Sequence, residues 1–444
     1  MSRQYPVLTR AAALRTHQFL QRRQLFQAHR RPRGHRLRRV LAPLALVGVL
    51  LLGACSTGDA AQEPVDIDPT PQAVQEELPQ AETDQLWLPY QFGSLALVDP
   101  QWESATVKQL DGFFAAMRPG EKALTFSVTD SEGNTLWRAQ RAKDDAGFVL
   151  TSTEEGQKVA VLTESGATST TASGYALTTG ERLWGPVEVP GPVHGPGLVF
   201  GPSPSEEATG AEAVALSADD GAVVSAEDLA ATRILGEFDG VLLSVDAEML
   251  RATEVTMVTE APGTEDLWQL PLAENDWPAE QLCAPPQARP GEGLALLETA
   301  PSSDSSESTT TRGALLEVSS GKVLATGIQD VLTDTATGST VYLRAGKIHG
   351  ENQQAGDQWE AAVGSEAQLS AAGGAIVYVL VDDSIRAYNV LTGEVAEAYD
   401  PSGSGNLTVP EIIAPSGAAL LHAGEQRYLA TTLPGEDVDL TGRG

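Results

Sequence analysis

Residues 387–394 read AYNVLTGE, and this short stretch decides the fold class of the chain. Three strand-like runs surround this turn: the apolar IVYVLV at 376–381, the alternating SIRAYN at 384–389, and EVAEA at 394–398. Runs of this length with turn residues between them are typical of antiparallel strands. The turn glycine, Gly393, supplies a positive φ, and Thr392 can bond the neighbouring backbone. The segment therefore predicts three antiparallel strands joined by two tight turns.

The same turn recurs along the chain. Related copies read DSEGNTLW, LTTGERLW, ALSADDG and LLEVSSG, at residues 130–137, 177–184, 215–221 and 315–321. The turn glycines stand 47, 41, 100 and 72 residues apart in the order Gly133, Gly180, Gly221, Gly321 and Gly393. The two longer gaps each fit two repeats, and degenerate copies ending at Trp268 and Trp359 fall inside them. A period of about 40–50 residues is the size of a propeller blade with four short strands.

A tryptophan follows the turn glycine by four residues in two copies, as Trp137 after Gly133 and Trp184 after Gly180. In this position the ring leaves the turn, and we expect it to be buried between neighbouring sets of strands. The other turns carry a different residue at this position, namely Ser225, Ala325 and Glu397.

The fold class predicted from these repeats is all-β. From Leu86 to Thr432 there are 347 residues, enough for about eight four-stranded blades or alternatively seven. A sandwich or barrel is the alternative within the same class. The Asp/Thr-Gly turn with its downstream Trp resembles the pyrroloquinoline-quinone-type (quinoprotein-like) β-propeller repeat. We also expect the strand at 94–98 to pair with the C-terminal strands, since a ring must join its first and last blades.

The N-terminal segment predicts where in the cell the protein is located. Residues 1–54 contain 11 Arg and no acid, and they end in an uncharged apolar run of 15 residues, 40–54. The junction Leu52-Gly53-Ala54-Cys55 resembles the bacterial lipoprotein signal. This resemblance implies a signal peptide over 1–54, cleavage between Ala54 and Cys55, and a lipid on Cys55. The protein would then be held by that lipid on the extracytoplasmic face of the cell membrane; a short signal anchor is the alternative.

The remaining boundaries follow from composition. Residues 55–84 contain several prolines, and their charged residues are all acidic, so they predict a disordered acidic tether. The propeller is predicted over 85–435 and a disordered tail over 436–444. The net charge of the whole chain is -31, which excludes a general nucleic-acid binder because phosphate would be repelled.

No catalytic, cofactor-binding or metal-binding residue is predicted from the sequence. The histidines after the signal, His194, His349 and His422, lack ligand spacing, and Cys283 has no adjacent cysteine. Quinone-binding members of the resembled family use a disulfide between adjacent cysteines, so the repeat carries over and the cofactor site does not. Acidic turns at 130–134 and 400–404 have side-chain oxygens at alternate positions, as a calcium-binding loop does. Asp and Ser side chains that bond the backbone of their own turn explain this pattern without a calcium ion.

The predicted function is a lipid-anchored binding or scaffold module at the cell envelope, without catalysis, for an unknown protein or cell-wall ligand. The alternative is an extracytoplasmic enzyme, a hydrolase, lyase or quinoprotein-type oxidoreductase, with its site in the propeller funnel. Convergent acids or histidines in the funnel would favour the enzyme, and an empty or apolar funnel would favour binding.

Overall fold

The computed structural model describes residues 68–143, 147–166, 169–202, 212–226, 232–255, 266–285, 290–299, 312–352, 357–382 and 384–435. The predicted signal peptide with Ala54, residues 55–67 of the predicted tether with Cys55, and the predicted tail lie outside these residues. In the described part, no helix has the length and apolar character needed to cross a membrane.

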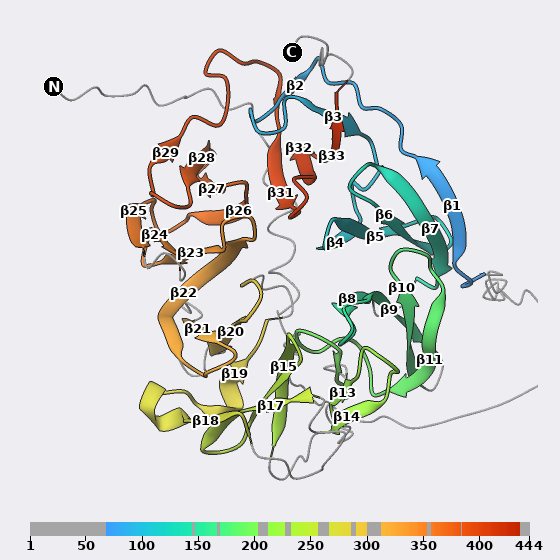
Figure 1. The fold of residues 1–444 in the computed structure, drawn as a ribbon, viewed down its shortest axis with the longest axis vertical. Coiled ribbons are helices and arrows are strands. Elements are labelled where there is room, and N and C mark those ends of the chain that lie inside the picture. The colour runs from blue at the N-terminus through green and yellow to red at the C-terminus, as the bar shows by residue number, and fades with distance from the viewer. Residues whose placement is uncertain are drawn as a thin grey trace, which may run out of the picture. The chain divides into compact units, whose positions relative to one another are not determined.

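Antiparallel sheets follow one another around a ring in Figure 1, and we name them blades A to H in chain order. Blade A contains β4 (Thr106–Leu110), β5 (Phe113–Pro119), β6 (Leu124–Thr129) and β7 (Asn134–Arg141). Blade B contains β8 (Phe148–Ser152), β9 (Lys158–Ser165), β10 (Thr170–Ala176) and β11 (Arg182–Val189). Blade C contains β12 (Val199–Phe200), β13 (Val214–Leu216) and β14 (Val223–Ala226). Blade D contains β15 (Arg233–Phe238), β16 (Val241–Val245), β17 (Met249–Glu254) and β18 (Trp268–Pro271).

Blades E and F share one seven-stranded sheet, because the 12-residue strand β22 (Val323–Asp334) passes from one blade into the next. Blade E consists of β19 (Leu282–Cys283), β20 (Leu294–Thr299), β21 (Arg312–Glu317) and the first half of β22. Blade F consists of the second half of β22 together with β23 (Ser339–Arg344), β24 (Lys347–Asn352) and β25 (Asp357–Ala362). The 3-10 turns η3 (Leu272–Asn275) and η4 (Ala279–Gln281) connect blade D to blade E.

The last two blades complete the ring. Blade G contains β26 (Gln368–Gly373), β27 (Ile376–Val381), β28 (Ser384–Asn389) and β29 (Val395–Ala396). Blade H contains β31 (Val409–Ile413), β32 (Ala419–Ala423) and β33 (Gln426–Pro434), with β3 (Leu95–Val98) as its fourth strand. The described residues thus form eight blade units, and the all-β propeller class predicted from the repeats is confirmed.

The expected pairing of residues 94–98 with the C-terminal strands is confirmed. Strand β3 pairs antiparallel with β33, with Leu97 opposite Ala430 and Val98 opposite Leu429. One apolar cluster then joins blade H to blade A, and it includes Leu420, Leu429 and Phe114. The last sheet therefore packs against the first.

Apolar clusters fill the space between neighbouring blades, which is why both faces of many strands are buried. In β9 the segment from Val159 to Thr163 is buried without alternation. Its residues divide between two clusters: Leu162 packs toward blade A, and Val161 packs toward blade C. A sheet covered on both faces gives such continuous apolar runs. The blades thus need each other to bury their apolar side chains.

Part of the predicted tether is folded instead. Residues 72–77 form β1 (Gln72–Glu77), which pairs antiparallel with β7 on the outer edge of blade A (Figure 1). The amide of Leu78 then donates to the carbonyl of Gly133 in blade A at 3.0 Å, and the amide of Ala81 donates to the carbonyl of Leu97 in β3 of blade H at 2.9 Å. Next, β2 (Leu86–Trp87) runs parallel to β30 (Asn406–Leu407). The tether predicted over 55–84 therefore has its boundary too late, because an open strand edge recruits a segment that has no apolar pattern of its own.

Candidate functional site

Two sets of loops emerge on one face of the ring. Because successive strands of a blade run in opposite directions, the loops between its first and second strands and between its third and fourth strands share a face. The turn glycines predicted from the repeats lie in loops of the second kind, and we call this side the turn face. In blade C the antiparallel bridge between Val193 and Phe200 takes the place of the first strand, so β13 and β14 correspond to its third and fourth strands. Their φ angles are all positive: Gly133 90°, Gly180 73°, Gly221 72°, Gly321 70° and Gly393 71°.

The structure places each repeat tryptophan against the turn of the following blade. The indole Nε1 of Trp137 donates to the carbonyl of Leu177 at 2.8 Å, and that of Trp184 donates to Ala218 at 2.8 Å. Both side chains are buried. The degenerate copies do the same, since Trp268 donates to Val318 and Trp359 donates to Val390, each at 2.7 Å. Thr392 supports its turn by accepting the amide of Glu394 at 3.3 Å.

A cavity of about 620 Å³ opens among the loops of blades A to E. Its walls come from Leu110 at the end of β4, from the loops that follow β8 and β13, from the β15–β16 turn, and from the residues ahead of β12 and β20. Every one of these loops belongs to the turn face. Rigid strands therefore hold a set of variable loops around one hollow, which is the usual way that a propeller presents a binding surface.

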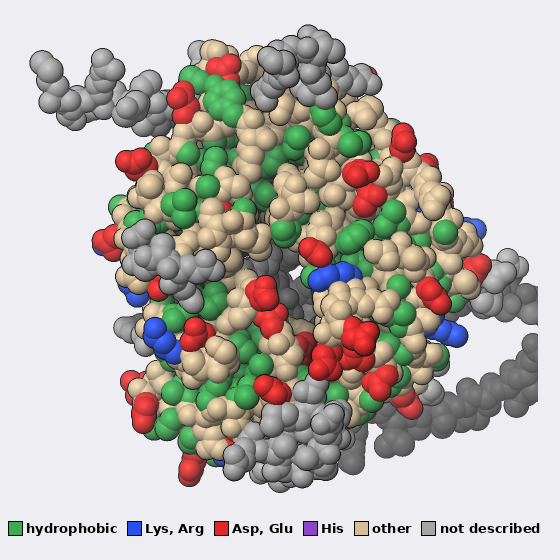
Figure 2. Space-filling view, viewed as in Figure 1, with side chains coloured by type: hydrophobic (Ala, Val, Ile, Leu, Met, Phe, Trp, Pro, Cys, Tyr) green, Lys and Arg blue, Asp and Glu red, His purple; other side chains and the backbone are tan. Residues whose placement is uncertain are grey.

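Acidic side chains line this cavity. Glu154, Asp219, Glu237 and Asp239 contribute to its walls, and no Lys, Arg or His is among the described residues that line it. Figure 2 shows several acidic side chains near the central opening of the ring, with a basic side chain at its edge. The sequence did not predict these four residues, because acids in turns usually face solvent. The signal that could have found them is their recurrence in loops that the repeat register places on one face.

The acidic loops are connected across blades. The amide of Glu154 in blade B donates to Oδ1 of Asp219 in blade C at 3.2 Å. The amide of Gly293 in blade E donates to Oδ2 of Asp239 in blade D at 2.5 Å. These contacts use one oxygen of each aspartate and hold neighbouring loops together. The cavity wall is thus fixed by backbone contacts and not by pairing with basic side chains.

Glu237 is an acid of the cavity wall whose environment raises its pKa. Burial raises the pKa of Glu237, the amide of Gly240 opposes that effect, and the charge of Asp239 adds to it. Its Oε1 accepts the Gly240 amide at 2.7 Å. Its Oε2 lies against Gly197, where an added Cβ would be only 2.3 Å away. The wall of the cavity therefore contains one half-buried carboxyl group with a raised pKa beside three exposed acidic side chains.

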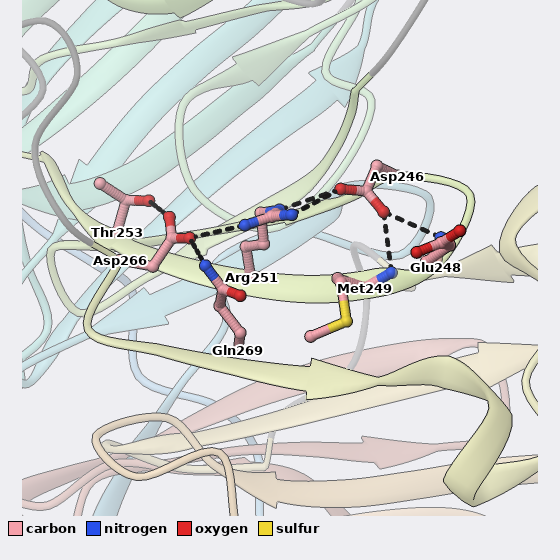
Figure 3. A network of polar contacts seen from close by, with 7 residues as sticks. All are labelled: Asp246, Glu248, Met249, Arg251, Thr253, Asp266 and Gln269. Carbon is pink, nitrogen blue, oxygen red and sulfur yellow. Dashed lines mark hydrogen bonds and ion pairs between the residues drawn. The ribbon is translucent and has the colours of Figure 1, made fainter.

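A second polar cluster, in blade D, is satisfied internally (Figure 3). Arg251 donates through Nε and Nη2 to Oδ2 of Asp246, at 3.0 and 2.9 Å, and through Nη1 to Asp266 at 2.9 Å. Asp266 also accepts from Thr253 at 3.2 Å and from Gln269 at 2.6 Å. Burial alone would raise the pKa of Asp246, but the amides of Glu248 and Met249 and the guanidinium of Arg251 lower it overall. The cluster ties β17 to the chain on either side of it and offers no free group to a ligand.

The histidines and Cys283 lie elsewhere. His349 stacks on Tyr342 in blade F with centroids 5.1 Å apart, and burial lowers its pKa. His422 belongs to blade H. Cys283 is half-buried, its Sγ lies 3.6 Å from the carbonyl of Glu298, and burial raises the pKa of its thiol. None of them lines the acidic cavity. Among the described residues, no group of three His, Cys, Asp or Glu side chains is placed to hold a metal ion.

The two acidic turns with alternating oxygens are built as turns. Asp130 accepts the amides of Glu132 and Asn134 through Oδ1, at 3.0 and 2.9 Å. Asp400 accepts both the amide and the hydroxyl of Ser402 through Oδ1, at 2.8 and 2.7 Å. These are the local bonds by which an aspartate stabilises its own turn.

The strand order defines the chain as a β-propeller protein. No protein-family model matches the chain, and no curated protein matches it. Solved structures similar to it include BamB from Moraxella catarrhalis, at 12% identity and a TM-score of 0.40, covering 76% of this chain and 98% of that one. A chain of the mitotic checkpoint complex matches at 10% identity and a TM-score of 0.37, covering 81% of this chain and 98% of that one. A eukaryotic initiation factor matches at 11% identity and a TM-score of 0.39, covering 71% and 79%.

Proposed function

We propose that this protein is a lipid-anchored extracytoplasmic β-propeller that binds a positively charged partner in the acidic cavity of its turn face and catalyses no reaction. The observation that carries this proposal is the cavity of about 620 Å³ with four carboxyl groups and no basic side chain among the described lining residues. Such a surface attracts cations and repels anions, and it steers a basic partner toward the ring.

The anchor part of the proposal rests on the sequence. The Leu52-Gly53-Ala54-Cys55 junction supplies a thiol directly after two small residues, as diacylglyceryl transfer needs. Residues between Cys55 and the first described residue, Asp68, connect the lipid to the propeller. Metabolic labelling with a fatty-acid analogue tests this part: the wild-type chain takes up the label, and a Cys55→Ala variant does not. Label on the variant contradicts the anchor.

The binding part is tested with a lysine-rich peptide as the probe and the full-length chain immobilised in detergent. We expect binding that weakens steeply with added salt, because exposed charges are screened. Replacing Glu154 and Asp219 by Gln and Asn removes two carboxylates from the cavity wall and should weaken binding. The matched control neutralises two exposed acids on the opposite face, Glu366→Gln and Glu425→Gln. Equal loss in both double variants, or equal binding of a glutamate-rich peptide, contradicts the assignment of the cavity.

A second candidate function is supported by Glu237. A carboxyl group with a raised pKa next to a second carboxyl group is an arrangement that acid–base hydrolysis uses. Acids that converge in one cavity are also the feature that, from the sequence, would favour an enzyme. A panel of chromogenic glycosides and esters tests this candidate. Turnover that is lost in Glu237→Gln and kept in Glu366→Gln would favour the hydrolase, and no turnover in the wild type would favour binding alone.

A further inference from the structure

The outer strand of blade A has an edge that is well suited to pairing. This strand, β7, spans eight residues, NTLWRAQR, and contains neither proline nor glycine. The equally long outer strand of blade B contains Pro186, and the outer strands of blades C and G have only four and two residues. Proline and a short length both protect an edge from pairing with another chain. Because β7 has neither protection, its outer row of backbone donors and acceptors is a template for a further strand.

Strand β1 covers this edge and contributes little besides its backbone. The pairing begins with Gln72 opposite Arg138, and the register is irregular between Ala73 and Glu76. All but one of the six residues are exposed, and no side chain of β1 belongs to the apolar clusters of the described residues beside it. Glu76 and Arg138 form an ion pair at 2.9 Å, but both side chains are exposed, and such pairs add little stability.

The attachment of β1 is also uneven along the strand. Gln75 lies at the irregularity with a φ of 51°, in the left-handed region that disfavours a residue with a Cβ atom. After the strand, Leu78 packs with the apolar cluster that joins blade H to blade A. Before it, the carbonyl of Pro69 accepts from Nη1 of the buried Arg141 at 3.0 Å, and Pro71 is half-buried. The strand is thus held more firmly at its C-terminal end and can open from its N-terminal end.

The closed position of β1 is weakly favoured. Ordering its six residues costs conformational entropy, and ladder hydrogen bonds offset this cost with little apolar burial to assist them. A segment with few buried apolar contacts opens locally while the rest of the molecule stays folded. When β1 opens, the outer backbone groups of β7 become available to another chain.

We propose that β1 is a releasable cover, and that the β7 edge beneath it is a docking site for an extended acidic segment of a partner protein. The partner adds a strand through its backbone, and one of its carboxylates meets Arg138 as Glu76 does when β1 is closed. In such strand addition the main-chain bonds give affinity, and alternate side chains give specificity. The site is separate from the acidic cavity, whose described lining includes no residue of β1 or β7.

Hydrogen exchange of the full-length chain in detergent tests the release. We expect the amides of β1 to exchange at least about tenfold faster than those of β6 inside the same sheet. A disulfide between Gln72→Cys and Arg138→Cys should slow this exchange, because residues directly opposite in an antiparallel pair lie within disulfide range. The matched control joins Thr171→Cys to Glu188→Cys in blade B and should leave β1 unchanged. Protection of β1 equal to that of β6 overturns the proposal.

The docking is tested with a fluorescent peptide that has the sequence of residues 70–79, TPQAVQEELP. We expect saturable binding to the full-length chain by fluorescence anisotropy. The oxidised Gln72→Cys, Arg138→Cys variant should lose this binding, and reduction of its disulfide should restore it. Glu76→Lys should act in opposite directions: in the peptide it weakens binding, and in the chain it loosens β1 and strengthens binding, each by about twofold to fivefold.

A peptide with the same composition in scrambled order is the control for nonspecific attraction. Binding that the oxidised disulfide leaves unchanged overturns the proposal, because the peptide would then lie elsewhere on the molecule. Equal binding of the scrambled peptide overturns it too, as does a Glu76→Lys chain that binds the peptide more weakly than the wild type. The reduced and oxidised forms carry the same two substitutions, so their comparison separates the cover from the loss of the Arg138 charge.

Discussion

Gly180 lies directly against the indole ring of Trp137, so that a Cβ added at position 180 would stand 2.9 Å from Cδ2 of the ring. The two residues belong to neighbouring blades, and the same pairing recurs as Gly221 with Trp184 and Gly393 with Trp359. The turn glycine of one blade is therefore also the floor of the pocket for the tryptophan of the blade before it. This relationship explains why turn and ring recur together in the sequence.

Replacing Gly180 by Ala should destabilise the protein for two reasons. The φ of 73° disfavours any L side chain, which costs about 1–2 kcal/mol, and the added methyl group strikes the Trp137 ring. Gly156→Ala is the control, because its φ is 84° and no atom lies near its Cβ position. Urea unfolding should show a larger loss for Gly180→Ala, by about 1–3 kcal/mol of overpacking. Equal losses would mean that the ring makes room at no cost.

Trp184→Ala should cost about 3–5 kcal/mol of unfolding free energy, because it removes a large buried ring between blades B and C. Trp184→Phe keeps most of the apolar contact and loses only the bond to the carbonyl of Ala218, so its cost should be smaller. Chemical denaturation of both variants checks the order. A Phe variant as unstable as the Ala variant would show that the hydrogen bond, and not the packing, dominates.

The repeat could be predicted from the sequence because its turns are locally determined. A glycine within a short run of Asp, Glu, Ser or Thr can be recognised in the sequence as a turn, and the spacing between such glycines indicates the size of a blade. Ser225 and Ala325 stand where other repeats have Trp. The turns of the following blades, which a Trp at these positions would contact, lie outside the described residues. At the junction of blades H and A, Val98 of β3 stands beside Gly133 where other junctions have a ring.

Other features depend on the assembled ring and could not be predicted. Strand β1 reads QAVQEE and is mostly exposed, so no apolar pattern announces it. It forms because the outer edge of β7 is available for pairing. The acidic cavity likewise requires acids from separate blades to face one hollow, and a single sequence does not show which turn acids converge. Arg141 is an ordinary strand residue until the fold buries it.

N-terminal truncation separates these contributions. Removing residues 1–67 should leave the melting curve unchanged, because the pairing segments begin at Gln72. Removing residues 1–77 deletes β1 and uncovers the edge of β7, so the melting temperature should fall. Removing residues 1–100 also deletes β3, and blade H then lacks its fourth strand; an insoluble or molten product is expected. Identical curves for the first two truncations would show that β1 adds nothing to stability.

The stability of blade H should fall in mild acid because of His422. Burial lowers the pKa of His422, the charge of Glu411 opposes that effect, and Arg427 reinforces it. Arg427 donates to the carbonyls of Trp102 and Ala105, at 3.1 and 2.7 Å, so it ties blade H to the chain that enters blade A. Since the folded pKa is below the unfolded value of about 6.5, the unfolded state takes up the proton first. Stability is then fully present above about pH 6.5 and declines as the pH falls toward the folded pKa.

His422→Gln removes the titrating group while keeping a polar side chain of similar length. The variant should lose the part of the pH dependence that sets in just below about pH 6.5, while the decline at more acidic pH, where carboxylates titrate, stays. Unfolding free energies measured by urea at a series of pH values between about 5 and 8 check this. His194→Gln is the control, since His194 is exposed at the start of blade C and should leave the curve unchanged. A His422 variant with the wild-type slope would assign the acid sensitivity to other groups, and a steeper slope would mean that His422 stabilises blade H in its protonated form.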